Sequence, residues 1–302
     1  MLAAMPEWPG VRHVPIPILR QSVHDSSVAI PPAADAVVAR TEDRTIAGPG
    51  GDLPVRVYTP QGTGPFPVIV YMHGGGYVVG DLDTQDMIAR ALCAWGEGVV
   101  ISVDYRLAPE HKFPAAVDDS FAALQWAAAN AASIGGDPAR LALAGDSAGA
   151  NMACATALTA RDAGGPAVRA VVNIYGSCNY PGTATPSSVE FADGPILKAD
   201  DVDWFWEQYL ADPAQQDDQR ASPLRAQSHA GLPPHFVGTA ECDPSRDDAE
   251  DFARKLIAAG VETQLKRYPG MVHGFASWVG FLPGAREVLQ DAGAFLKTHL
   301  SH

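Results

Sequence analysis

The sequence predicts an α/β fold with a mostly parallel sheet that helices cover on both faces. Three observations carry this prediction. Short apolar runs alternate with longer stretches of helical composition along most of the 302 residues. One apolar run leads into Gly145-Asp146-Ser147-Ala148-Gly149, and small helix-compatible residues follow. The last two apolar runs end in loops that carry an Asp and a His. Repeated strand–helix alternation is typical of a parallel sheet.

Each element follows from local composition, taken in chain order. Residues 1–36 are rich in proline, and we expect one or two short helices there rather than a strand. The next two runs alternate apolar and polar residues around Gly48-Pro49-Gly50-Gly51, which predicts an antiparallel pair. Later apolar runs predict buried strands, and periodic stretches predict helices. The expected strands are 37–47, 53–59, 67–72, 98–103, 141–144, 168–175, 235–240 and 262–268, and the expected helices are 84–95, 114–132, 150–160, 244–259 and 285–300.

The alternation of strands and helices stops between residues 176 and 233. This stretch is polar and rich in Pro and Asp, and it encloses one aromatic segment at residues 202–210. Together with residues 1–36 it is the natural candidate for a mainly helical cap over one edge of the sheet. The expected organisation is therefore a cap made of residues 1–36 and 176–233 on a catalytic domain made of residues 37–175 and 234–302.

Composition excludes several classes of protein. The formal net charge of −14 argues against binding nucleic acid or an anionic membrane surface, because both require clustered Lys and Arg. We see no signal peptide and no apolar stretch of membrane-spanning length. The cysteines lie far apart in sequence without a Cys-x-x-Cys pair, which favours reduced structural thiols and a cytoplasmic location. They are Cys93, Cys154, Cys178 and Cys242.

Ser147 is the candidate nucleophile. It lies at the centre of Gly145-x-Ser147-x-Gly149, the pattern of a sharp strand-to-helix turn that presents a serine at its apex. Such a turn brings strand and helix so close that side chains two residues either side would clash, and glycine removes the clash. The N-terminus of the following helix would point its free N–H groups and positive dipole at the serine.

A serine hydroxyl needs a base, and the base needs a group that orients it. In this architecture the acid follows a late strand and the His follows the last one. His273 lies in a glycine-flanked loop directly after the last expected strand, and Asp243 lies in the loop after the strand before it. Glu241 is the alternative acid. Asp247 and Asp248 would fall in the first turn of the next helix, where we interpret them as capping or surface charges.

A glycine-rich loop supplies the third requirement, an oxyanion hole. His73-Gly74-Gly75-Gly76-Tyr77 directly follows the expected strand 67–72. Only glycines let consecutive backbone N–H groups approach a substrate oxygen closely. We therefore expect Gly75, Gly76 and Ala148 to donate to the oxyanion, and His73 to be a structural hydrogen-bonding residue.

Other conspicuous residues have structural interpretations. Asp146 is expected to orient the turn around Ser147 rather than react. Residues 104–111 predict a buried polar network in which Arg106 pairs with a carboxylate. The aromatic segment is either core or the wall of an apolar acyl pocket. The candidate pocket residues are Tyr77, Trp204, Phe205 and Trp206.

Taken together, these motifs resemble those of the bacterial hormone-sensitive-lipase-like esterases of the α/β-hydrolase superfamily. The matching pieces occur in the family's order between about residues 70 and 275. Ser245 departs from the pattern, since the family usually has an apolar residue there, and Ala150 stands where glycine is common. The motifs are His73-Gly74-Gly75-Gly76, Asp104-Tyr105-Arg106-Leu107-Ala108-Pro109-Glu110, Gly145-Asp146-Ser147-Ala148-Gly149, Asp243-Pro244-x-Arg246-Asp247 and His273-Gly274-Phe275.

The resemblance implies an eight-stranded α/β-hydrolase fold and carboxylesterase activity on short to medium acyl esters through an acyl-enzyme. It assigns Ser147 as nucleophile, His273 as general base and Asp243 as the residue that orients it, without a cofactor or metal. It also allows a homodimer. The alternatives are an amidase or a deacetylase with the same triad, or a non-catalytic ligand-binding protein on this scaffold. The presence of His273 favours an enzyme over a binding protein.

Overall fold

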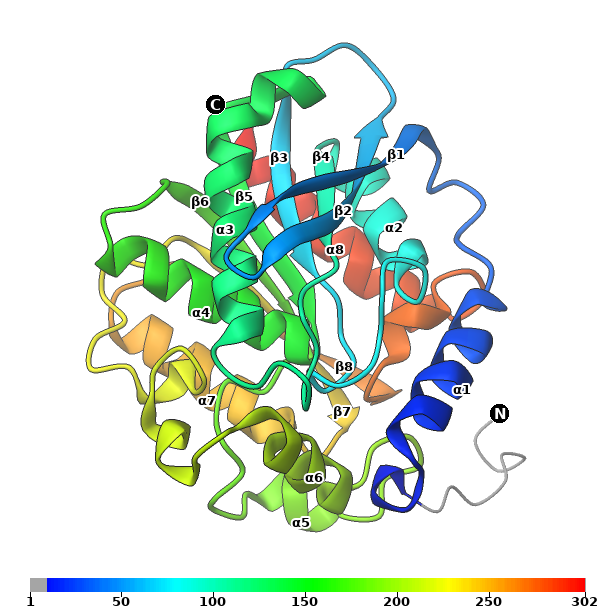
Figure 1. Cartoon of the computed structure of the whole chain (residues 1–302), viewed down its shortest axis with the longest axis vertical. Coiled ribbons are helices and arrows are strands. Elements are labelled where there is room, and N and C mark those ends of the chain that lie inside the picture. The colour runs from blue at the N-terminus through cyan, green and yellow to red at the C-terminus, as the bar shows by residue number, and fades with distance from the viewer. Residues whose placement is uncertain (1–9, 302) are drawn as a thin grey trace.

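The computed structural model describes residues 10–301, and its strands form one eight-stranded sheet (Figure 1). The strand order is β1-β2-β4-β3-β5-β6-β7-β8. The pairs β1–β2 and β2–β4 are antiparallel, and the other neighbours are parallel. The strands are β1 (Val38–Gly48), β2 (Gly51–Pro60), β3 (Phe66–Met72), β4 (Val99–Val103), β5 (Gly136–Asp146), β6 (Val168–Ile174), β7 (His235–Cys242) and β8 (Thr263–Val272).

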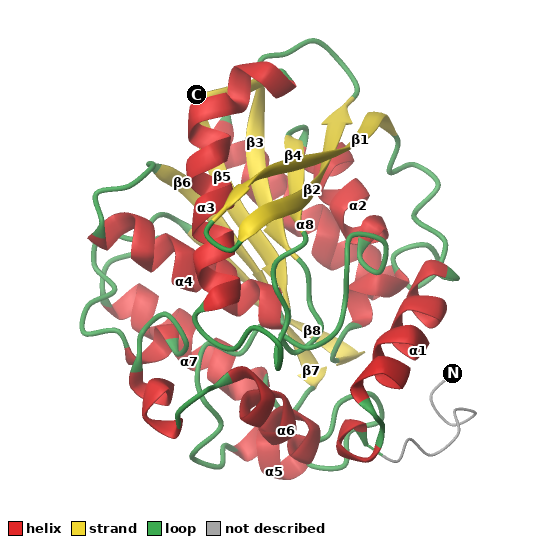
Figure 2. Cartoon of the chain, viewed as in Figure 1, coloured by secondary structure: helices red, strands yellow, loops and turns green. Residues whose placement is uncertain are grey.

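Helices cover both faces of this sheet, because its central strands are apolar on both sides. In β3, Val68 and Val70 pack against one layer of helices, while Ile69 and Tyr71 pack against the other. Figure 2 shows α3 and α4 in front of the sheet and α8 behind it. The helices of ten or more residues are α1 (Ile16–Val28), α2 (Asp86–Gly96), α3 (Ala115–Asn130), α4 (Ala148–Asp162), α6 (Ala199–Tyr209), α7 (Arg246–Ala258) and α8 (Pro283–Leu300).

The expected eight-stranded, mostly parallel sheet is confirmed, with differences at the ends of elements. Strand β5 extends from Gly136 rather than from residue 141, because its first residues continue toward the parallel neighbour β3 at Phe66. Helix α7 begins at Arg246 rather than at Pro244, since Pro244 and Ser245 belong to the preceding loop. Within its described residues, 10–36, the N-terminal segment forms the 13-residue helix α1 and, just before it, a 3-10 helix at Val11–His13.

Two segments outside the sheet meet below it. Figure 1 shows α1 at the lower end of the molecule together with α6 and the short helix α5 (Pro186–Glu190). The backbone N–H of Val11 donates to the buried Asp201 carboxylate at 2.8 Å, and Arg12 forms a two-point ion pair with Glu207. Residues about 190 positions apart in sequence therefore hold these two segments together.

None of the helices between residues 10 and 301 combines the length and the apolar composition that a membrane crossing requires.

Helix α4 approaches the sheet closely at Gly149. A Cβ atom at this position would lie 2.0 Å from the carbonyl oxygen of Met72 in β3. On the strand side, a Cβ at Gly145 would lie 2.3 Å from the backbone carbonyl carbon of Gly149. The two glycines let the end of β5 and the start of α4 pack with backbone against backbone.

We expect Gly149→Ala to lower the free energy of unfolding by about 3 kcal/mol or more, because the added methyl group overlaps the backbone of β3. Urea unfolding measures the change. Gly96→Ala is the matched control. It also lies in a helix, its new Cβ would have neighbours no closer than 3.4 Å, and alanine favours the helix by about 1 kcal/mol. Similar losses in both variants would contradict the close approach at Gly149.

Candidate active site

Ser147 lies at the apex of the turn between β5 and α4. Its backbone has φ 52° and ψ −124°, a combination that costs a non-glycine residue energy and persists only where neighbours hold it. One such neighbour is β6, because the Ser147 N–H donates to the Ile174 carbonyl at 2.9 Å. The turn therefore presents the serine side chain at the C-terminal ends of the central strands.

Ser147, His273 and Asp243 form a hydrogen-bonded row. The Ser147 Oγ lies 2.7 Å from Nε2 of His273, and Nδ1 of the same ring lies 2.7 Å from Oδ2 of Asp243. A carboxylate accepts only, so Nδ1 carries the proton and donates to Asp243, which leaves Nε2 to accept from the serine hydroxyl. The three residues come from the ends of β5, β7 and β8, where the sequence places them.

The surroundings of Asp243 distinguish it from the acids that flank it in sequence. Its carboxylate is buried, and Oδ1 accepts from the Ser245 N–H at 2.8 Å. Glu241, the alternative acid, instead accepts from the Gly270 N–H. Asp247 and Asp248 lie in the first turn of α7, where both were expected to be capping or surface charges. Asp247 accepts from the Ser187 N–H of α5, and Asp248 is buried, so it is not a surface charge. Burial raises the pKa of Asp248 to about 6.

Opposing effects act on the protonation of His273. Burial alone would lower its pKa, but the adjacent Asp243 carboxylate stabilises the imidazolium, and the net result is a pKa above the ordinary value for histidine. The ring is thus a stronger base than a free imidazole, and Asp243 is placed to stabilise the positive charge that forms when His273 takes a proton.

The glycine loop faces the same cavity as Ser147. Gly75 and Gly76 have φ +125° and +58°, and both line this cavity together with Ala148. Space also requires glycine, because a Cβ at Gly75 would lie 2.0 Å from the Val79 carbonyl oxygen. Ala148 is the first residue of α4, so its N–H has no acceptor within the helix. These groups can donate to an oxyanion beside Ser147.

Asp146 ties the serine turn to the glycine loop. Its buried carboxylate accepts from the Tyr71 hydroxyl at 2.6 Å, from the Gly74 N–H at 2.8 Å and from the Tyr175 hydroxyl at 3.4 Å. These donors belong to β3, to the glycine loop and to the residue that follows β6. Asp146 therefore holds the serine turn and the glycine loop at a set spacing, in keeping with the orienting role expected of it.

His73 and Arg106 have the structural roles expected of them. The His73 ring is buried, stacks on Tyr105 and has its Nδ1 2.7 Å from the Gly74 carbonyl oxygen. Burial lowers the pKa of His73 to about 4, which keeps the ring neutral. Arg106 donates from its guanidinium to the buried Asp119 carboxylate, whose Oδ2 also accepts from the Arg106 N–H.

An apolar cavity of about 270 Å³ opens above Ser147 and His273. Of the expected pocket residues, Tyr77, Phe205 and Trp206 line it. Phe205 lies directly against the glycine loop, since a Cβ at Gly76 would lie 2.3 Å from its ring. Trp204 instead packs in a separate cluster with Val11, Leu19, Val78, Val79 and Ala108.

Several lining residues were not expected from the sequence. Helix α1 contributes Leu19 and Val23, and α2 contributes its N-cap residue Gln85, whose Oε1 accepts from the Ser277 hydroxyl. No sequence motif marks them. For Leu19 and Val23, the only sequence signal is that they lie in a proline-rich segment assigned to the cap. That assignment does not indicate which face of the helix lines the cavity.

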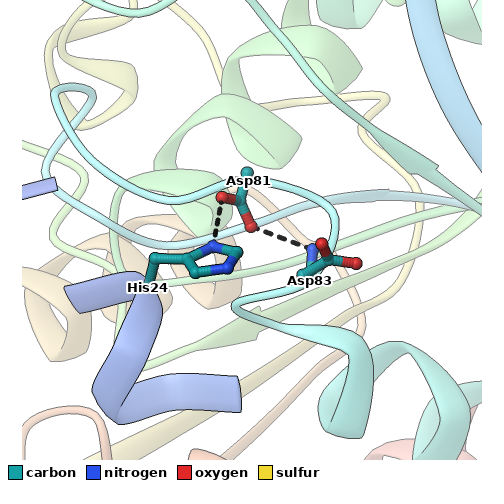
Figure 3. Close-up of side chains that lie close together, drawn as sticks. All are labelled: His24, Asp81 and Asp83. Atoms are coloured by element: carbon teal, nitrogen blue, oxygen red, sulfur yellow. Dashed lines mark hydrogen bonds and ion pairs between the residues drawn. The ribbon is translucent and has the colours of Figure 1, made fainter. Parts of the chain in front are cut away.

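Helix α1 is fastened to the loop that follows the glycine loop (Figure 3). His24 Nδ1 lies 2.8 Å from Oδ2 of Asp81, and Oδ1 of Asp81 accepts from the N–H groups of Asp83 and Thr84. The hydrogen bond to Asp81 raises the pKa of His24. Because both oxygens of Asp81 already have partners, we interpret the group of His24, Asp81 and Asp83 as a tether for α1 rather than a metal site.

Comparison with known proteins places this geometry in a family. A model of the α/β-hydrolase fold family matches residues 69–277. The chain belongs to this family. The match includes the glycine loop, the serine turn, the acid and the histidine, and ends at Ser277 in the loop that follows His273.

Relatives within the α/β-hydrolase family share most of the chain. The carboxylesterase NlhH of Mycobacterium tuberculosis is 45% identical over 270 residues, which span 86% of this chain and 83% of the relative. The ethyl acetate hydrolase of Pseudomonas putida is 35% identical over 93% of this chain and 89% of its own. The crystal structure of EstE1, a thermostable carboxylesterase cloned from a metagenomic library, is similar with a TM-score of 0.90 at 42% identity, covering 95% of this chain and 98% of EstE1. The expected hormone-sensitive-lipase-like family and its fold are confirmed.

We expect Tyr71→Phe to lower the free energy of unfolding by about 2 kcal/mol, because it removes a hydrogen bond to the buried Asp146 carboxylate. Urea unfolding measures the loss. Tyr58→Phe is the matched control, since its hydroxyl donates to Asp86, whose carboxylate is 25% exposed and regains water as a partner. The control should lose less, and a loss equal to that of Tyr71→Phe would contradict the tethering role of Asp146.

Proposed function

We propose that this α/β-hydrolase is a serine carboxylesterase that cleaves short- to medium-chain acyl esters through an acyl-enzyme. One observation carries the proposal: the row Ser147–His273–Asp243 opens into a cavity that Gly75 and Gly76 also line. A nucleophile, a base with its orienting acid, and oxyanion donors thus surround one space where an ester carbonyl fits. The names of the relatives support the same enzyme class.

In the first half-reaction, Ser147 Oγ attacks the ester carbonyl carbon while His273 Nε2 takes the hydroxyl proton. Asp243 stabilises the imidazolium, and the N–H groups of Gly75, Gly76 and Ala148 stabilise the oxyanion. His273 then gives its proton to the leaving alkoxide, which departs as the alcohol and leaves the acyl group on Ser147.

In the second half-reaction, water takes the place of the alcohol. His273 removes a proton from the water as it attacks the acyl carbon, and the same N–H groups hold the second oxyanion. Collapse of this intermediate returns the proton from His273 to Ser147 Oγ and releases the acid. No residue beyond those of the first step is needed.

The cavity supports the proposed substrate class. Its volume of about 270 Å³ is at the small end for ligand pockets, and its walls are mostly apolar, which suits a short hydrocarbon acyl group. Helices α1 and α6 supply part of these walls. We propose that residues 1–36 and 176–233 act as the cap, of which residues 1–9 lie outside the described part of the chain. The cytoplasmic location, a homodimer, and the absence of nucleic-acid, membrane and cofactor partners stay predictions.

We expect Ser147→Ala to lower kcat/KM for p-nitrophenyl acetate by about 10⁴ or more, since removal of the nucleophile leaves only the oxyanion hole and binding. A series of p-nitrophenyl esters from acetate to palmitate, run on wild type and variant, measures this and locates the preferred chain length. Near-wild-type turnover by a folded Ser147→Ala protein would overturn the assignment. If the folded wild type hydrolyses none of the esters in the series, the amidase or binding-protein alternative is favoured.

The protonation of His273 sets the pH dependence. The base must be neutral to accept the serine proton, so activity is lost as pH falls through the His273 pKa. Because that pKa is raised, we expect the acid limb of kcat/KM to have its midpoint above the ordinary histidine value of about 6.5.

In Asp243→Asn the imidazolium loses its stabilising charge, so the acid limb should move to lower pH while the maximal rate falls by about 10⁴. A pH–rate profile of both proteins measures the shift. Glu241→Gln, at the end of β7 two residues before Asp243, is the control and should keep the wild-type midpoint. An unmoved acid limb in Asp243→Asn would contradict its pairing with His273.

A further inference from the structure

Separate parts of the fold line the catalytic cavity. One group of lining residues comprises Val23 of α1, Gln85 and Ser277, and the Ser277 hydroxyl donates to Gln85. Another group comprises Ser177, Val202 and Ser245, and the Ser177 hydroxyl donates to Asp248 of α7. Ser177 follows β6, Val202 lies on α6, and Ser245 directly precedes α7.

A second hollow adjoins the catalytic cavity. It is a groove of about 350 Å³ between α5, α6 and the start of α7, and Val202 and Ser245 line it as well as the catalytic cavity. These two residues therefore form a shared wall. The Ser245 side chain ends one atom beyond its Cβ, so this wall is thin at Ser245.

Hydrogen bonds hold the sides of the groove in place. The buried Ser187 of α5 donates from its hydroxyl to the Pro244 carbonyl at 3.0 Å, and its N–H donates to Asp247 at 2.8 Å. The N–H of Asp247 donates back to the Ser187 hydroxyl at 3.1 Å. Helix α5 is thus fastened to the beginning of α7, and the groove between them is part of the folded structure.

The chemistry of the triad decides which half of an ester faces the groove. The leaving oxygen must lie within hydrogen-bonding reach of His273 Nε2 to receive its proton. The alcohol half is therefore placed beside the loop that carries His273 and Ser277. The acyl half lies on the other side of the carbonyl carbon, and we take it to extend toward Val202 and Ser245, where the second hollow adjoins the cavity.

We propose that acyl chains longer than the catalytic cavity can hold pass between Ser245 and Val202 and extend along this groove. The inference rests on the proposed ester hydrolysis at Ser147, and it adds the route of the acyl chain and the residues that limit its length. The groove suits a hydrocarbon chain, because small apolar side chains supply much of its lining. These are Pro181, Ala184, Val189, Ala192, Ala199 and Pro244.

The test compares two substitutions that obstruct the route at different points. Ser245→Leu thickens the shared wall, and Ala192→Trp fills the groove at an exposed residue whose backbone alone forms hydrogen bonds in the structure. Asp193→Trp is the matched control, because it adds the same side chain at the neighbouring exposed residue, outside the groove lining. The readout is the ratio of kcat/KM for p-nitrophenyl decanoate to that for p-nitrophenyl acetate.

We expect wild type to hydrolyse the decanoate and both obstructing variants to lower the ratio at least tenfold. Each methylene that loses its burial accounts for about a fourfold loss, so two or more displaced methylenes suffice. Asp193→Trp should keep the wild-type ratio. The acetate rate is the internal reference, because acetate does not reach the groove.

An unchanged decanoate-to-acetate ratio in Ala192→Trp would overturn the inference. An equal fall of kcat/KM for both esters in Ser245→Leu would overturn it as well, because that result would mean that only the support of Asp243 had changed. A wild type that hydrolyses acetate but not decanoate would also overturn it. Each of these results leaves ester hydrolysis intact. If the proposed function itself fails, the wild type shows no Ser147-dependent hydrolysis of either ester.

Discussion

The buried carboxylate of Asp146 is the interaction on which the rest of the site depends. It directly precedes Ser147 in the chain and accepts hydrogen bonds from β3, from the glycine loop and from the residue after β6. Two separate strand ends, one followed by Ser147 and the other by the glycine loop, are thereby held at one spacing. A tether of this kind limits reorganisation when negative charge develops on the substrate oxygen.

The site divides into two parts of different origin. The reactive groups all lie at strand ends of the sheet, where parallel neighbours fix their relative positions. Part of the cavity wall comes from α1 and α6. The segment just before α1 is bound to α6, because the Val11 N–H donates to Asp201. Helix α1 is bound to the loops that follow β3 and β4, because the Arg20 guanidinium donates to the Val78 and Ala108 carbonyls. The strand ends therefore position the reactive side chains, whereas α1 and α6 help to shape the cavity.

This division explains what the sequence could predict. Ser147, Asp243, His273 and the glycine loop follow apolar runs directly, so local patterns locate both the strands and the residues at their ends. Which aromatic residues of α6 line the cavity depends on the N-terminal segment, nearly 190 residues away, because Trp204 packs against Val11 and Leu19. Three consecutive aromatic residues also give no periodicity that would separate Trp204 from Phe205 and Trp206. The burial of Asp248 likewise depends on Ser177, which approaches it only in the folded chain.

The position of α1 outside the sheet has a consequence for how the substrate range of such an enzyme changes in evolution. Helix α1 lies outside the sheet, yet its residues Leu19 and Val23 line the cavity above Ser147. Arg20 and His24, which hold α1 in place, bind backbone carbonyls and surface carboxylates. They do not bind Ser147, Asp243 or His273. Recombination that exchanged this N-terminal helix could thus give a lineage a new substrate range in one genetic event, with the hydrolytic centre inherited unaltered.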